Sequence, residues 1–109
     1  MQSGFAIPVV ACYGIAYKPN VDDVRESPSV EIVERLAERG DLKVLVVEPN
    51  VSELPRALRE HLNVHLVTAD EAQRAADIVA LLVSHKQFQR MDRRRLLGKV
   101  IVDAIGLMN

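Results

Sequence analysis

The chain has 109 residues, of which 49% are hydrophobic and 27% are charged, and its formal net charge is −1. A chain of this length supports one domain with one hydrophobic core, and its large apolar fraction with little net charge excludes intrinsic disorder. The charge balance argues against a general nucleic-acid binder, which needs a strong basic excess, although a local basic patch stays possible. No apolar run reaches the roughly 20 residues that cross a membrane.

Short β-branched apolar runs alternate with amphipathic segments along the chain. Residues 1–6 are expected to be disordered or to be a remnant of the cloning vector, and the folded domain to span 7–109. Strands are predicted at 7–16, 42–47, 64–67, 77–84 and 99–104, and helices at 28–39, 54–62, 69–76 and 86–97. This alternation predicts a single α/β domain, with a doubly wound, Rossmann-like parallel sheet of five strands in three layers.

Two of the predicted helices carry sequence signals at their starts. Ser27 precedes Pro28, so we expect the serine hydroxyl to accept a free helical N–H and the proline to occupy the first helical position. Thr68 and Glu71 have the T-x-x-E spacing of a capping box.

Ligands of doubly wound sheets bind outside the carboxyl ends of the strands, near the point where the strand order reverses. This rule directs attention to residues 17–25, 48–50, 84–86 and 103–109. The loop after the first strand holds Gly14 but no G-x-G-x-x-G, and its length of about ten residues is too long for a dinucleotide turn. We therefore expect that this sheet does not hold NAD in the usual way.

The loop after the first strand contains two candidate anion-binding side chains. Lys18 can neutralise a phosphate while the ring of Tyr17 packs on a sugar or base, or it is a surface lysine beside a half-buried tyrosine. Arg25 can reach a bound anion, or it pairs with Asp22 or Asp23 and stiffens the loop. The residue types alone leave both questions open.

Other polar residues near the strand ends allow more than one interpretation. Glu48 can be a ribose-binding acid, but it follows Gly14 by about 34 residues instead of the roughly 20 of the dinucleotide pattern, which favours a structural role or a contact to another domain. His85 ends the fourth predicted strand and can make a polar contact there. The basic run 92–95 is a solvated helix face, or it contacts a phosphate or a subunit. The histidine spacing predicts no metal site.

Cys12 is the single cysteine of the chain, so no internal disulfide can form. It lies inside a predicted buried strand without a neighbouring base, which indicates a core thiol and not a nucleophile. The N-terminus has neither the positive region nor the cleavage site of a secretion signal. A cytoplasmic location is expected.

The segment Gly14–Pro28, GIAYKPNVDDVRESP, resembles the G-x-A-[FY]-K…D-x-R-E-S signature of the UDP-glucose/GDP-mannose dehydrogenase family. In that family the segment opens the C-terminal, UDP-binding domain. The segment Val46–Asn50 with Leu54-Pro55 is similar to the UDP-N-acetyl-D-mannosamine dehydrogenase branch. The resemblance covers residues 7–109.

The resemblance implies an NAD-dependent enzyme that oxidises the sugar C6 hydroxyl to a carboxylate, here UDP-N-acetyl-D-mannosamine to its uronate. NAD would be bound mainly by an N-terminal domain, and a central helical region and the nucleophilic cysteine would also lie outside this chain. Tyr17 and Lys18 match the family pair that contacts the UDP-sugar, and Arg25 matches the arginine that reaches toward NAD. A homo-oligomer is implied, and this chain alone is expected to be inactive.

Ile105 departs from the family pattern, which has a nucleotide-binding arginine or lysine at this position. An isoleucine makes no charge-assisted hydrogen bond, so an interaction of roughly 1.5–3 kcal/mol is lost. The departure favours a second hypothesis, in which the domain has lost UDP binding and serves as a non-catalytic interaction or assembly module.

Overall fold

The computed structural model describes residues 7–16, 27–91, 93–96 and 98–104. Within these residues, strands alternate with helices as the sequence predicts. The elements, in chain order, are β1 (Val9–Tyr13), α1 (Pro28–Glu38), β2 (Lys43–Val47), α2 (Arg56–Arg59), β3 (Val64–Leu66), α3 (Ala69–Ala75), β4 (Ile78–Leu81), α4 (Lys86–Gln89), the 3-10 helix η1 (Arg93–Leu96) and β5 (Val100–Asp103).

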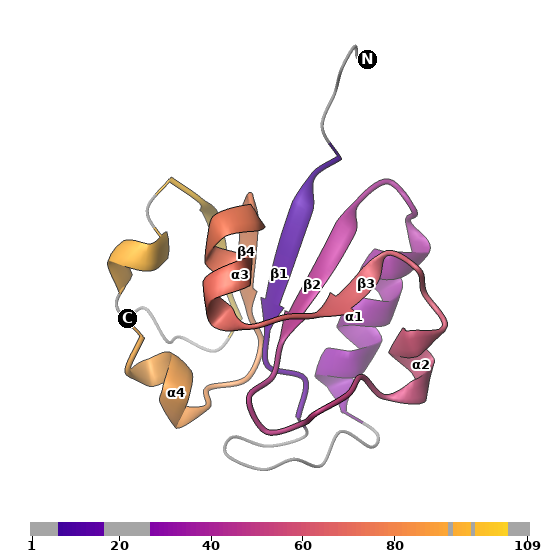
Figure 1. Ribbon diagram of the computed structural model, residues 1–109, viewed down its shortest axis with the longest axis horizontal. Helices are drawn as coiled ribbons and strands as arrows, with labels where there is room; N and C mark the ends of the chain where they lie inside the picture. The colour runs from indigo at the N-terminus through magenta and orange to yellow at the C-terminus, as the bar shows by residue number, and fades with distance from the viewer. Residues whose placement is uncertain (1–6, 17–26, 92, 97, 105–109) are drawn as a thin grey trace.

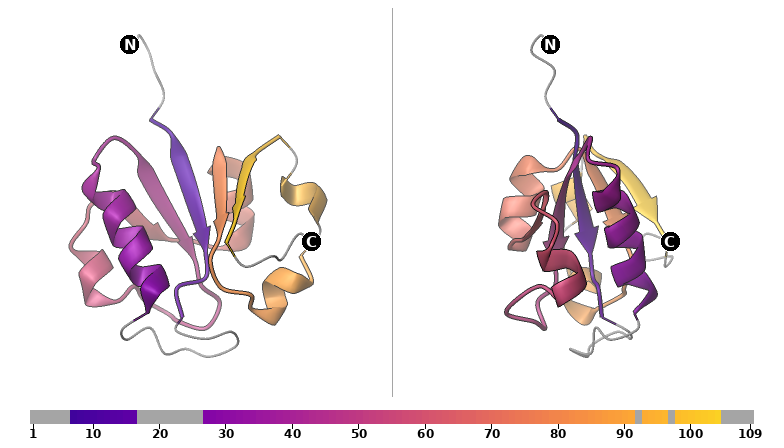
Figure 2. Two further views of the ribbon diagram at one scale, coloured as in Figure 1. Left: turned by 180° about the vertical axis from the view of Figure 1, so that it is seen from behind. Right: turned by 90° about the vertical axis from the view of Figure 1, so that its right-hand side faces the viewer.

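The five strands form one parallel sheet in the order β3-β2-β1-β4-β5, as Figure 1 shows. Two crossovers lead from β1 outward to β3, and the next one returns past β1 to β4, so the strand order reverses between β1 and β4. Helices α1 and α3 lie on opposite faces of the sheet (Figure 2). The doubly wound fold in three layers is therefore confirmed.

The two faces of the sheet bury separate hydrophobic clusters because side chains alternate along each strand. Cys12 of β1 lies in the cluster with Val33 of α1 and Leu58 of α2. Its neighbour Tyr13 lies in the other cluster, with Phe88 of α4. The central strand β1 is thus covered on both faces. No helix in the described parts of the chain is long and apolar enough to span a membrane.

Both predicted helix starts are found, but only one has the expected side-chain hydrogen bond. The Oγ1 atom of Thr68 accepts a hydrogen bond from the N–H of Glu71 at 3.2 Å, and the Glu71 carboxylate accepts one from the Thr68 N–H at 3.2 Å, which completes the capping box. Pro28 begins α1 as predicted, but the Ser27 hydroxyl makes no capping bond. It is buried and donates to the carbonyl of Ala16 at 3.3 Å, so it joins the start of α1 to the end of β1.

The stretch predicted as a helix at 86–97 is divided into α4 and the 3-10 helix η1. The N–H of Met91 donates to the Phe88 carbonyl, three residues back, at 3.1 Å. A hydrogen bond between residues three apart is typical of the tighter 3-10 turn, and here it closes the end of α4. The second helix is also shorter than predicted and covers Arg56–Arg59.

Gly14 lets β1 end in close contact with both neighbouring strands. Its φ of 98° lies in the region that favours glycine, and its N–H donates to the Val47 carbonyl at 2.9 Å. A Cβ atom at this position would lie 2.6 Å from the Cβ of Val83, which follows β4. Both the backbone angle and the available space therefore require glycine here.

Gly14→Ala is expected to lower the free energy of unfolding by about 2–4 kcal/mol, from backbone strain and overpacking together. Gly40→Ala is the matched control, because Gly40 also has a positive φ of 73° but no atom within 4 Å of the added Cβ. Gly40→Ala should cost about 1–2 kcal/mol. Urea denaturation of both variants measures the difference, and equal losses would show that the contact with Val83 has no energetic weight.

Candidate functional site

The side chain of Glu48 joins the ends of β1 and β2. Glu48 directly follows β2, and its side chain is fully buried. Its Oε1 atom accepts hydrogen bonds from the backbone N–H groups of Ile15 at 2.9 Å and Ala16 at 3.1 Å. Its Oε2 atom accepts one from the N–H of Asn50 at 3.1 Å. The carboxylate therefore holds the backbone that leaves β1 against the turn that leaves β2.

His85 reaches the same carboxylate from the β4 side of the sheet. Its side chain is fully buried, and its Nε2 atom lies 2.9 Å from Oε1 of Glu48. Its Nδ1 atom lies 3.4 Å from the Nδ2 atom of Asn50. The imidazole also packs beside Phe88 at a centroid distance of 5.4 Å, and Phe88 meets Tyr13 edge-on at 5.3 Å. Three adjacent strands thus end in one polar network, formed by the buried Glu48 and His85 and the half-buried Asn50.

These contacts support the structural interpretation of Glu48. Both of its carboxylate oxygens accept hydrogen bonds from protein groups, so the carboxylate is not presented to a ribose. The end of β1 also has no glycine-rich turn after Gly14. The described residues therefore do not fit a dinucleotide site of the usual kind. The predicted polar contact of His85 is confirmed, and its partner is Glu48.

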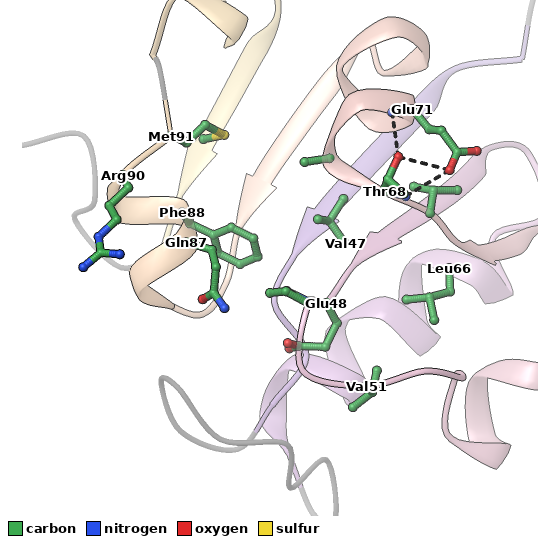
Figure 3. A pocket seen from close by; sticks show the side chains of 13 residues that line it. Val47, Glu48, Val51, Leu66, Thr68, Glu71, Gln87, Phe88, Arg90 and Met91 are labelled. Atoms are coloured by element: carbon green, nitrogen blue, oxygen red, sulfur yellow. Dashed lines mark hydrogen bonds between the residues drawn. The ribbon is translucent and has the colours of Figure 1, made fainter.

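A pocket of about 690 Å³ opens beside the network, between the ends of β2 and β3 and helix α4. Its lining is mostly apolar, with polar groups from α3 and α4. Figure 3 shows Phe88 and Gln87 of α4 facing Val47 and Glu48, with Thr68 and Glu71 bonded to each other on the wall formed by α3. The lining residues are Val47, Glu48, Pro49, Val51, Leu66, Val67, Thr68, Ala69, Glu71, Gln87, Phe88, Arg90 and Met91.

The sequence directed attention to the strand ends 48–50 and 84–86, but it did not predict that their side chains meet. Asn50 was not singled out, and neither was the contact between Glu48 and His85. The available signal was the presence of polar residues directly after three apolar strands. Turning this signal into contacts requires the strand order, which places β2 and β4 on either side of β1.

Cys12 is a core thiol, as its sequence context predicts. Burial raises the pKa of the thiol from 9.0 to about 12, so the thiol stays protonated at neutral pH. A protonated buried thiol is a poor nucleophile. Among the residues that the structure describes, no group of three or more His, Cys, Asp or Glu side chains could hold a metal ion.

The raised pKa of Cys12 predicts a loss of stability at alkaline pH. The unfolded thiol releases its proton near pH 9, while the native thiol keeps it. The contribution of the thiol to the free energy of unfolding is therefore fully present below pH 9 and is lost between pH 9 and about 12. In this range the contribution of the thiol to the free energy of unfolding falls by about 1.4 kcal/mol per pH unit. Urea denaturation across this range should show a shallower decline for Cys12→Ala than for the unchanged chain. An equal decline of the free energy of unfolding in both proteins would contradict the raised pKa of Cys12.

The site residues that the family resemblance indicates, Tyr17, Lys18 and Arg25, lie outside the described residues, as does Ile105. Tyr17 directly follows Ala16 in the sequence. Arg94 of the basic run lies in η1 and is exposed, which is typical of a solvated face.

Residues 11–109 match the sequence model of the UDP-glucose/GDP-mannose dehydrogenase family, UDP binding domain. The chain belongs to this family. It is 46% identical over 103 residues to the NDP-N-acetyl-D-galactosaminuronic acid dehydrogenase of Ralstonia nicotianae, covering 94% of this chain and 24% of that protein. It is 42% identical over 98 residues to the UDP-N-acetyl-D-mannosamine dehydrogenase of Escherichia coli K12, covering 90% of this chain and 23% of that protein. The chain thus spans about a quarter of the length of these relatives.

Solved structures of similar proteins also match this chain over about a quarter of their own length. The UDP-N-acetyl-mannosamine dehydrogenase of Staphylococcus aureus superposes with a TM-score of 0.68 at 26% identity, covering 97% of this chain and 24% of that chain. The GDP-mannose dehydrogenase of Pseudomonas aeruginosa has a TM-score of 0.76 at 24% identity, covering 96% of this chain and 26% of that chain, and shares the fold.

Proposed function

We propose that the chain is the UDP-binding, C-terminal part of an NAD-dependent nucleotide-sugar 6-dehydrogenase that converts UDP-N-acetyl-D-mannosamine to UDP-N-acetyl-D-mannosaminuronate. The observation that carries the proposal is the match of residues 11–109 to the UDP-binding domain of the family. The names of the similar relatives support the substrate class, because they refer to nucleotide sugars with an N-acetylated hexose. The domain would help to close the active-site cleft.

In this proposal Tyr17 and Lys18 contact the UDP-sugar, and Arg25 reaches toward NAD. The support from the fold is the position of the preceding backbone. Ile15 and Ala16 are buried and fixed by Glu48 at the end of the central strand β1, beside the point where the strand order reverses. This is the edge at which doubly wound sheets bind their ligands. A lysine that follows there supplies a point charge for a phosphate.

NAD in this proposal is held mainly by the N-terminal domain of the enzyme. Bound NAD would supply the hydride acceptor for this four-electron oxidation, with one NAD for each of the two hydrides and water for the second carboxylate oxygen. The described residues support this division, because the Glu48 carboxylate is engaged by protein groups and Cys12 is a buried, protonated thiol. The nucleophilic cysteine is likewise proposed to lie outside this chain, which alone would not turn over.

The proposed partners are the N-terminal and central domains of the same enzyme, in a homo-oligomer. Val100 and Val102 of the edge strand β5 are 62% and 51% exposed. They pair in register with Ile78 and Ala80 of β4, which face the side of the sheet that carries α1. Among the described elements, no helix covers this half of that face, as the left view of Figure 2 shows. An exposed apolar surface of this kind is suited to docking another domain.

A second candidate function is a non-catalytic interaction module that has lost UDP binding. Ile105 favours it, because the family places a cation at this position. The two candidates differ in whether the chain binds UDP at all.

Titration of the chain with UDP is expected to raise its melting temperature. Ligand at about 100 times its Kd adds roughly 2.7 kcal/mol, which is a rise of roughly 10 °C or more for a domain of this size. Lys18→Ala should abolish the rise, because it removes the phosphate contact. Lys43→Ala is the matched control, since Lys43 is an exposed lysine at the opposite end of the sheet, where β2 begins. Calorimetry and thermal denaturation measure both effects.

A substitution at the departing position separates the two candidates further. Ile105→Lys restores the family cation and should tighten UDP binding, by roughly 1.5–3 kcal/mol for a charge-assisted hydrogen bond. If neither the unchanged chain nor Ile105→Lys binds UDP at millimolar concentration, UDP binding by this domain alone is ruled out. Binding that survives Lys18→Ala would contradict the role proposed for Lys18.

A further inference from the structure

The Glu48 side chain continues the hydrogen bonding of the sheet beyond the end of β1. The strand ends at Tyr13, and Gly14 still donates to a carbonyl of β2. The next two N–H groups, from Ile15 and Ala16, have a side chain as their acceptor, the Oε1 atom of Glu48. The path of the backbone at these two residues therefore depends on where this carboxylate lies.

His85 sets the position of that carboxylate from the opposite side. Its Nε2 atom contacts the same Oε1 atom at 2.9 Å, and both side chains are fully buried. Because Glu48 already accepts from three backbone N–H groups, its oxygens act as acceptors, and the proton of this contact belongs to Nε2 of His85. His85 is thus a donor that holds the carboxylate in the orientation that receives Ile15 and Ala16.

Asn50 completes this arrangement on the other ring nitrogen. Its Nδ2 atom lies 3.4 Å from Nδ1 of His85. An amide N–H that donates to Nδ1 leaves the proton of a neutral imidazole on Nε2, which is the form that donates to Glu48. Asn50 then donates to His85 and His85 donates to Glu48, whose carboxylate also accepts from the backbone N–H groups that follow β1.

We propose that His85 is a positioning residue for nucleotide binding, which acts through Glu48 on the backbone of Ile15 and Ala16. This inference rests on the proposed function, because the residues proposed to contact UDP follow Ala16 directly in the sequence. His85 itself is buried behind the network, so it affects the ligand through the backbone that it fixes.

Two substitutions at this position separate hydrogen-bond donation from packing. His85→Gln keeps an N–H donor that can reach Glu48, whereas His85→Leu fills the space without a donor. Both variants lose the imidazole ring beside Phe88, so the difference between them isolates the hydrogen bond. Asn63→Ala is the control for lost stability, since the Asn63 amide bridges the carbonyls of Ala37 and Leu42 at 3.1 and 3.0 Å, before β2 begins.

The experiment uses the full 109-residue chain and two readouts. The backbone amide chemical shifts of Ile15 and Ala16, measured by NMR without ligand, report the hydrogen bonds to Glu48. The Kd for UDP, measured by calorimetry, reports their effect on the ligand. His85→Leu should shift both amides and weaken UDP binding at least about ten-fold, because the backbone that leads to Lys18 is no longer held and the loss of one ligand hydrogen bond changes Kd by about that factor. His85→Gln and Asn63→Ala should stay within about three-fold of the unchanged chain.

Other outcomes overturn the inference. If His85→Leu leaves the two amide shifts unchanged, or weakens UDP binding no more than Asn63→Ala, His85 does not position this backbone. If the unchanged chain does not bind UDP, the proposed function fails for the isolated domain, and the role of His85 in nucleotide binding fails with it, while the amide shifts still show whether the structural link exists. If His85→Leu does not fold, Asn50→Ala takes its place, since it keeps the backbone N–H that donates to Glu48 and removes the side-chain amide that faces Nδ1 of His85. Unchanged amide shifts in Asn50→Ala would then overturn the inference.

Discussion

The carboxylate of Glu48 is buried where three neighbouring strands end, and the edge of the sheet is arranged around its hydrogen bonds. A buried polar group is costly unless its hydrogen-bonding capacity is filled, and removing one hydrogen-bond partner costs about 1–3 kcal/mol, or more when the group is charged. Backbone N–H groups from the ends of β1 and β2 and the imidazole of His85 meet this demand together. Gly14 supplies the steric condition, because only a residue without Cβ lets β1 end so close to Val83. The same constraint fixes the backbone that leads to the segment proposed to bind UDP.

The fold was largely predictable because its signals are local. Runs of β-branched residues mark the strands, of which β1, β2 and β4 are largely buried on both faces, and the spacing of Thr68 and Glu71 marks the start of α3. The errors arose where tertiary contacts decide the local structure. Ser27 occupies the predicted N-cap position, but its hydroxyl donates to the carbonyl of Ala16 instead of accepting a helical N–H. Such a partner, 11 residues away along the chain, is not visible in a local pattern.

The site was predictable in its place but not in its contacts. The rule for doubly wound sheets led to the ends of the strands, where Glu48 and His85 are found. Their contact joins residues 37 positions apart, and it depends on the strand order and on the depth at which each side chain is buried. Family resemblance indicated a different set of residues in the loop after β1, whose proposed roles depend on the backbone that the network holds.

The position of one proton tests this account most directly. Long-range ¹H–¹⁵N correlation spectra of the chain at neutral pH distinguish protonated from unprotonated imidazole nitrogens in His85. The account predicts a proton on Nε2, where the ring donates to Glu48, and an unprotonated Nδ1 opposite the amide of Asn50. An unprotonated Nε2 would place a lone pair against the Glu48 carboxylate, and it would contradict the claim that His85 holds this carboxylate as a donor.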